Sequence, residues 1–307
     1  MTPVVLNGVS ALPDLGVILA EGPDAANFLH GQLTQDFVLL GASEARLAAL
    51  CTPKGRVIAS FLGIRPAPER IVLVISRDLL AATLKRLSMY VLRAKVKLSD
   101  ASDAFALYGV AGTALAANGL DPAAPPGRCV AIGDAHAVSL YPADGVPRAL
   151  WIAPAGHAAP QGPALDPALW PWSEVRSGIV TLTQPVTEAF VPQMLNYESV
   201  GGVNFKKGCY PGQEVVARSQ FRGTLKRRTY LVQSDGEIAA GQEVFAAGDP
   251  EQPVGTVAQA APAPGGGWAG LISIQIAAVD GGGLHARSVD GPTLRVEPLP
   301  YALLEDV

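Results

Sequence analysis

The first hundred residues alternate between short apolar runs and polar turns. Strands are predicted where these runs occur, at residues 15–19, 46–50, 56–64 and 70–75. Residues 52–55 would join the two middle strands as a hairpin. From Asp78 to Val91, apolar side chains recur at the spacing of one helical face, which predicts a helix. A shorter helix is expected after Asp24, because aspartate is a good N-cap residue.

The middle and the end of the chain carry different patterns. Strands are predicted at residues 104–110, 129–132, 137–141 and 149–153, with a short helix at 111–117. This order indicates a small α+β sandwich, and the Pro/Gly/Ala-rich stretch 154–167 that follows it is typical of a linker. Beyond Thr224 the predicted strands have no helix between them, and they lie at residues 228–232, 243–246, 255–259, 270–276 and 293–297. They predict a C-terminal β-barrel or sandwich over about residues 223–307.

Composition narrows the class of protein. A chain of 307 residues with 49% apolar and 16% charged residues has material for two or three well-packed domains. The net charge of −4 argues against direct nucleic-acid binding, which favours a basic surface. The N-terminus has no signal-peptide pattern, and no apolar run reaches the ~18 residues of a membrane span. A soluble, cytoplasmic protein with no membrane partner is expected.

The cysteines point away from a metal site. Cys51, Cys129 and Cys209 form no CxxC pair and no cluster with histidines, so neither a disulfide framework nor a zinc site is expected. Cys209 differs from the other two because it follows Lys206 and Lys207, whose charges would favour the thiolate. Glycines on both sides would let another group approach the thiol. The alternative is a Gly-Pro turn that contains a small buried thiol, and the residues alone leave both open.

The same segment carries a resemblance to a known family. Residues 207–214 read KGCYPGQE and are followed by VAR and FRG, which is similar to the K-G-C-Y-x-G-Q-E signature of the YgfZ family. Other parts of the chain resemble that family too, namely residues 28–36, 54–56, 190–196, 201–205 and 297–301. The resemblance spans nearly the whole chain, and its central signature is specific.

The resemblance implies an α+β fold shared with the aminomethyltransferase of glycine cleavage. In this GcvT-like cloverleaf, three domains surround a central tetrahydrofolate pocket. Residues 1–98 and 168–222 would form a discontinuous N-terminal folate-binding domain, residues 99–167 a ferredoxin-like part of the middle region, and residues 223–307 a C-terminal antiparallel β-barrel. The returning segment would bring Cys209 back beside the N-terminal region.

The resemblance also implies a function and a site. The expected function is a tetrahydrofolate-binding accessory protein for the assembly or repair of iron–sulfur clusters in certain enzymes, including tRNA-modifying ones. Its cofactor would be tetrahydrofolate or a folate derivative, and its partners would be iron–sulfur enzymes or cluster-assembly proteins. Cys209 would be the functional thiol, with its ionisation tuned by Lys207. The residues expected on the folate side are Trp170, Arg176, Gln193, Asn196, Tyr210, Gln213 and Glu214.

Departures from the family pattern leave two alternatives. Leu15 stands where the family has a tryptophan, Thr52 stands where an aspartate is common, and Arg176 lies near the position of the acidic residue that holds the pterin in aminomethyltransferases. These changes count against a folate-dependent aminomethyltransferase, which remains the first alternative. The second is a non-catalytic scaffold that binds RNA or an acidic protein through a basic face around residues 85–97, extended by residues 226–228.

Overall fold

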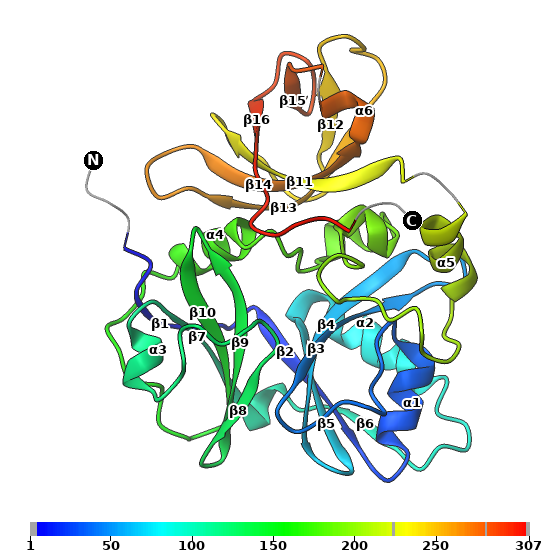
Figure 1. Ribbon diagram of the computed structural model, residues 1–307, viewed down its shortest axis with the longest axis vertical. Coiled ribbons are helices and arrows are strands. Elements are labelled where there is room, and N and C mark those ends of the chain that lie inside the picture. Colours follow the sequence, from blue (N-terminus) through cyan, green and yellow to red (C-terminus); the bar gives the residue numbers. More distant parts are fainter. Residues whose placement is uncertain (1–4, 223–224, 280, 305–307) are drawn as a thin grey trace.

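A computed structural model describes residues 5–222, 225–279 and 281–304. Two five-stranded antiparallel sheets stand next to each other and a closed β-barrel sits above them (Figure 1). The first sheet has the order β3 (Ala45–Cys51), β4 (Val57–Ala67), β5 (Arg70–Ser76), β2 (Leu15–Glu21) and β6 (Lys97–Asp100). Helices α1 (Ala25–Gln32) and α2 (Arg77–Ser88) belong to this part of the chain. The predicted hairpin is therefore confirmed as β3–β4.

The second sheet combines one strand from the N-terminus with four strands from the middle segment. Its order is β1 (Gly8–Ala11), β7 (Phe105–Ala111), β10 (Val146–Pro154), β9 (Ala135–Ala143) and β8 (Cys129–Ile132). A 3₁₀ turn (Ser102–Ala104) precedes β7, and the short helix α3 (Ala114–Ala117) follows it. Because β1 pairs with β7, residues 8–11 lie in the second sheet, whereas the predicted boundary places them with residues 1–98 in the N-terminal domain.

The returning segment connects the sheets to the barrel. It contains α4 (Leu169–Arg176), two 3₁₀ turns (Gln184–Val186 and Pro192–Leu195) and α5 (Gln213–Phe221). Tyr197 is completely buried in this segment and donates a hydrogen bond from its hydroxyl to the Val180 carbonyl at 2.6 Å. The apolar residues of the segment share one continuous core with the first sheet.

The C-terminal domain is a closed antiparallel barrel. Its order is β11 (Arg227–Ser234), β14 (Trp268–Gln275), β13 (Gly255–Pro262), β12 (Glu243–Ala246), β15 (Leu284–Ala286) and β16 (Thr293–Glu297), with α6 (Ile276–Val279) after β14. Alternating side chains fill its interior, as in other small barrels. The mixed α+β class and the C-terminal antiparallel barrel are therefore as expected.

One local expectation differs in detail. Asp24 precedes α1, but its side chain makes no capping bond and accepts the Lys95 backbone N–H instead, at 2.7 Å. In the described parts of the chain, no helix combines the length and the apolar character that crossing a membrane would need.

Candidate functional site

A cavity of about 300 Å³ opens between the two sheets, beneath α4. Strands β3, β4 and β5 supply one wall, β9 and β10 supply the other, and most of the lining is apolar. The polar side chains that line it come from Arg46, Ser60, Ser76, Ser139, Tyr141, Arg148, Glu174, Ser177 and Thr181. A largely apolar cleft with a few convergent polar groups is typical of a small-molecule site.

Helix α4 places two of these side chains together. Trp170 and Glu174 are four residues apart, so they lie on the same face of the helix, and both line the cavity. The indole of Trp170 lies against Gly109 of β7, where an added Cβ would come within 2.3 Å of the ring. Glycine at this position therefore makes room for the tryptophan, and the ring is fixed before any ligand arrives.

A buried arginine completes the polar end of the cavity. The Arg148 guanidinium lies 5.1 Å from the centre of the Trp170 ring and donates hydrogen bonds to the Ser173 hydroxyl (2.9 Å) and the Tyr141 carbonyl (3.1 Å). Burial lowers the pKa of Arg148 to about 10, although the charge of Glu174 opposes this change. Arg148 therefore remains charged at neutral pH.

Glu174 is the carboxylate of this site. Burial raises its pKa, while the charge of Arg148 acts in the other direction. The Trp170 Nε1 atom is buried, but it reaches hydrogen-bonding geometry with none of the described residues. The indole N–H of Trp170 and the carboxylate of Glu174 thus line the same cavity, and both can form further hydrogen bonds. This suits a flat ring that carries both donors and acceptors. These residues fit the pterin of a folate.

Arg176 does not belong to the cavity. Its guanidinium forms ion pairs with Asp144 at 2.7 Å and with Glu297 of β16, so it ties α4 to the second sheet and to the barrel. The cavity lining therefore gives no support to a direct contact of Arg176 with folate. Residue 176 is two positions beyond Glu174, which turns it to another face of the helix.

Gln193 and Asn196 are also held by structural contacts outside the cavity. The Gln193 amide donates to the Val216 carbonyl at 2.7 Å. Asn196 has a left-handed φ of 57° and pairs with both backbone groups of Thr229 in β11. Both side chains are fully buried. The cavity lining thus gives no support to a direct contact of either residue with folate.

Cys209 lies on a separate part of the molecule. It is exposed, in the loop before α5, and neither it nor the other signature residues Tyr210, Gln213 and Glu214 line the cavity. The loop packs on the first domain, because Gly212 has a φ of 83° and lies against Thr52 and Gly55 of the β3–β4 turn. The segment therefore returns to the N-terminal region, but the thiol faces solvent there.

Lys207 anchors this loop. Its side chain is buried and its ammonium donates to the carbonyls of His30 and Leu33, the latter at 2.8 Å, at the C-terminal end of α1. It also lies 4.6 Å from the centre of the Tyr210 ring. Burial lowers the pKa of Lys207 to about 8, although the charges of Asp36 and Cys209 oppose this change. The lysine is thus close enough to Cys209 for the two charges to interact.

The other two thiols differ from Cys209. Cys51 and Cys129 are buried, and burial raises their pKa values to about 12 and about 11. Cys51 is therefore a packed thiol. Among the described residues, no three His, Cys, Asp or Glu side chains gather as a metal site would require.

The basic faces expected from the sequence are only partly present. Lys85, Arg93, Lys95 and Lys97 are exposed. Arg228 cannot extend a basic surface, because it is buried and its guanidinium bonds to the Glu198 carboxylate at 2.7 Å.

Glu174, Arg148 and Tyr141 are the site residues that the sequence reasoning missed. The pairing of Trp170 with Glu174 at a helical spacing of four was a signal that could have identified the glutamate. Arg148 and Tyr141 meet α4 only through the packing of the second sheet, so no local pattern marks them.

Comparisons with known proteins agree with this fold. No protein-family model matches the chain. The tRNA-modifying protein YgfZ of Edwardsiella ictaluri is 30% identical over 95% of this chain and 91% of its own, and that of Sodalis glossinidius is 31% identical over 96% and 93%. The crystal structure of the glycine cleavage system aminomethyltransferase T from Bartonella henselae superposes with a TM-score of 0.67, at 16% identity, over 96% of this chain and 86% of that one. The chain therefore belongs to the YgfZ family, on the aminomethyltransferase fold.

Proposed function

We propose that this protein is a cytoplasmic tetrahydrofolate-binding accessory factor for the assembly or repair of iron–sulfur clusters in certain enzymes, including tRNA-modifying ones. The observation that carries the folate part is the cavity in which Trp170, Arg148 and Glu174 converge. The relatives' name supports the link to tRNA modification.

Each cavity residue has a role in this proposal. The Trp170 indole offers a flat surface for the pterin or the benzoyl ring. Glu174 accepts hydrogen bonds from the ring donors of the pterin, and burial strengthens such bonds. Arg148 holds the indole and the carboxylate in place through its contacts with Trp170 and Ser173. Leu15, which also lines the cavity, offers an apolar contact at the position where the family has a tryptophan.

Cys209 has the second role. A stable cluster normally takes about four thiolates, so one exposed cysteine holds a cluster only together with ligands from a partner. We propose Cys209 as a transient ligand or nucleophile at the surface, with Lys207 favouring its thiolate. In the described structure the thiol and the cavity are separate sites, so folate and partner need not compete for the same space.

A second candidate is one-carbon transfer on folate. Glu174 favours it, because a carboxylate does face the cavity although the sequence suggested that it was missing. Incubation with methylene-tetrahydrofolate or with candidate aminomethyl donors would produce turnover under this candidate. No turnover, together with saturable folate binding, would leave the accessory role.

Titration with tetrahydrofolate tests the cavity. Saturable quenching of tryptophan fluorescence is expected in the wild type, and Trp170→Phe should lose most of it. Glu174→Gln should weaken binding about 10- to 100-fold, because it removes charge-assisted hydrogen bonds. Trp268→Phe is the matched control, because Trp268 lies in the barrel and outside the cavity lining. If quenching survives in Trp170→Phe and vanishes in Trp268→Phe, the ligand binds near the barrel and not in the cavity.

A cell-based assay tests the accessory role. Cys209→Ala should fail to support the activity of iron–sulfur enzymes in cells that lack the native protein, while it folds and binds folate as the wild type does. Cys129→Ala serves as the control, since it removes a buried thiol. Full activity of Cys209→Ala would refute the proposed role of the thiol. It would not contradict the proposed folate site.

A further inference from the structure

The positive charge of this acidic protein is concentrated around α5. Residues 200–228 contain seven lysines and arginines and one acidic residue, a net charge of +6, whereas residues 229–307 contain two arginines and ten acidic residues, a net charge of −8. The overall charge of −4 therefore hides a strongly uneven distribution. A basic patch, rather than the net charge, is what determines binding to a polyanion.

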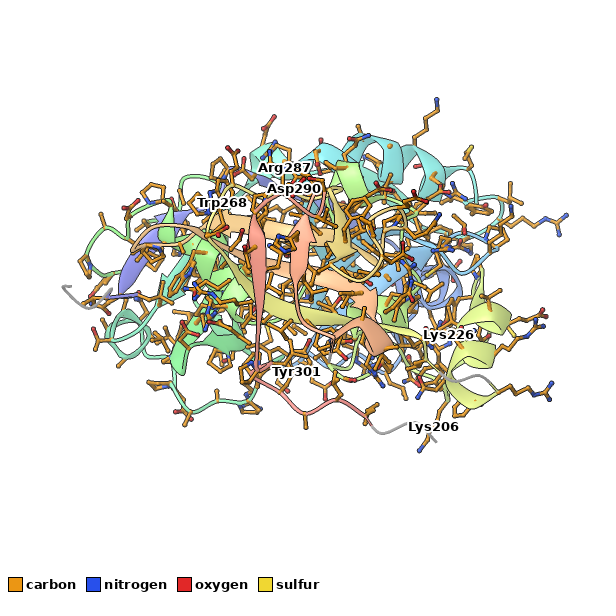
Figure 2. The ribbon with its side chains drawn as sticks, turned by 90° about the horizontal axis from the view of Figure 1, so that it is seen from above. Lys206, Lys226, Trp268, Arg287, Asp290 and Tyr301 are labelled. Atoms are coloured by element: carbon orange, nitrogen blue, oxygen red, sulfur yellow. The ribbon has the colours of Figure 1, made fainter. Side chains whose placement is uncertain are left out.

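Four cations of this segment are exposed on one surface. Arg218 lies in α5, Arg222 follows the helix as its C-cap residue, and Lys206 and Lys226 belong to the chain on either side. Figure 2 shows Lys206 and Lys226 at the end of the molecule where α5 lies. None of these four side chains forms an ion pair with any other residue in the described ranges. Their charge is thus available to a partner.

An exposed aromatic ring lies among these cations. Phe221, the last residue of α5, is 55% exposed. Phe205, which precedes Lys206, meets it edge-to-face at 5.3 Å between ring centres and holds it in position. Phe205 therefore lies at the C-terminal end of α5, and Gly212 lies at its N-terminal end. The loop between them, which contains Cys209, runs alongside the helix. Large apolar side chains are costly to leave in water, and a fixed exposed ring is a typical stacking platform.

We propose that this surface, defined by Lys206, Arg218, Phe221, Arg222 and Lys226, binds RNA. Phosphates would contact the four cations, and an unstacked base would pack on the free face of Phe221. Single-stranded loops of structured RNA offer this combination of backbone charge and accessible bases. An acidic protein would use the cations but has little need for an isolated ring amid four positive charges, so RNA is the better match. Bound RNA would lie next to the Cys209 thiol.

Fluorescence anisotropy with a labelled, unmodified tRNA transcript tests this surface. The Arg218→Gln/Arg222→Gln variant should weaken binding at least tenfold and reduce the slope of log affinity against log salt by about 1.5, since each lost phosphate contact contributes about 0.7 to 0.9. Phe221→Ala should weaken binding about 5- to 100-fold without changing the slope, because stacking does not release counterions.

Lys85→Gln/Arg93→Gln is the matched control, because it removes the same charge from exposed positions of another surface. It should leave both affinity and slope near the wild-type values. Equal losses in the control and the α5 variant would show non-specific attraction and overturn the proposal. So would competition by polyglutamate as effective as that by unlabelled tRNA at equal charge, which would indicate an acidic protein partner. Folate titration of each variant keeps this result separate from the central cavity.

Discussion

Lys207 shows how much a single side chain does in this protein. Its ammonium binds the last carbonyls of α1, where a cation is favoured by the helix dipole, and this fixes the start of the Cys209 loop. The same charge interacts with the Cys209 thiol. The neighbouring Lys206 is exposed and has neither buried partner. Two adjacent lysines of the signature thus have different roles.

Replacement of Lys207 should change the reactivity of Cys209 in a pH-dependent way. Below pH 8 the ammonium is charged, because burial lowers the pKa of Lys207 only to about 8, and this charge lies beside the Cys209 loop. In Lys207→Met, alkylation of Cys209 by iodoacetamide at pH 7 should be about 3- to 10-fold slower than in the wild type. The two rates should converge above pH 8, where the wild-type lysine also becomes neutral. Mass spectrometry of the labelled protein measures both rates.

Two internal controls accompany this measurement. Lys206→Met removes the exposed neighbour and should have a much smaller effect, because water screens its charge. Cys51 and Cys129 should stay unlabelled in the folded protein, since both are buried and have raised pKa values. A difference between wild type and Lys207→Met that persists up to pH 10 would mean that the lysine acts through loop geometry alone.

The sequence predicted some of these side chains better than others. Trp170 was expected on the folate side from the family resemblance, and it lines the cavity. The expectation for Arg176 followed its proximity in sequence to the family's acidic position, but its ion pairs with Asp144 and Glu297 lie outside the cavity, whereas Glu174 lines it. Gln193 and Asn196 were also expected on the folate side. In the structure, their side-chain amides donate hydrogen bonds to buried backbone carbonyls.

Helix α5 depends on the turn beneath it. Gly212 begins the helix with a φ of 83°, and its backbone lies against the β3–β4 turn. The signature glycine is therefore required twice, once for its positive φ and once for the close approach of the two backbones. The KGCYPGQE signature therefore has a structural role, the contact between the β3–β4 turn and the helix, in addition to supplying the thiol.

Gly212→Ala should destabilise the protein by about 2 kcal/mol or more. A Cβ there would come within 2.4 Å of the Thr52 carbonyl, in addition to the strain of a left-handed φ. Gly119→Ala is the matched control, because Gly119 has a φ of 70° but nothing within 4 Å of the added Cβ, so only the strain of about 1 kcal/mol remains. Urea unfolding of the two variants measures the difference. Equal losses would mean that the close contact has no energetic weight.

Prediction from the sequence was reliable for long elements and uneven for short ones. Helix α2 and the β3–β4 hairpin have clear periodicity over many residues, and the structure has both. The short strands β8 and β12 were also predicted, but β1, β6 and β15 were missed, because alternation over three or four residues is a weak signal and tertiary pairing decides such strands. The cavity itself could not be predicted from local patterns, since its walls come from two sheets and α4.

The three parts of the molecule are joined mainly by the returning segment. The Met194 carbonyl accepts hydrogen bonds from Thr229 (2.7 Å) and Ser273 (2.9 Å) of the barrel. Asn196 adds a pair of bonds to the Thr229 backbone, at 2.8 and 3.2 Å, as a neighbouring strand would. The buried pair of Arg228 and Glu198 lies at the same junction. The barrel is thus attached through polar contacts rather than through apolar area alone.

Asn196→Ala should loosen this junction and cost about 3 kcal/mol, because it leaves a buried N–H and a buried carbonyl of Thr229 without these partners. Urea unfolding followed by Trp268 fluorescence and by far-UV circular dichroism should then give transitions that no longer coincide. Asn27→Ala, at an exposed position of α1, should leave them coincident. Coincident transitions in Asn196→Ala would mean that the barrel unfolds with the rest of the chain without this joint.

The walls of the cavity also set an order of events during synthesis. Residues 12–76 provide one side, but the lining is complete only with Trp170, Glu174 and the stretch that ends at Gly201. A nascent chain cannot enclose a ligand in this cavity until residues up to Gly201 have left the ribosome, so the folate proposed above would affect only late stages of folding.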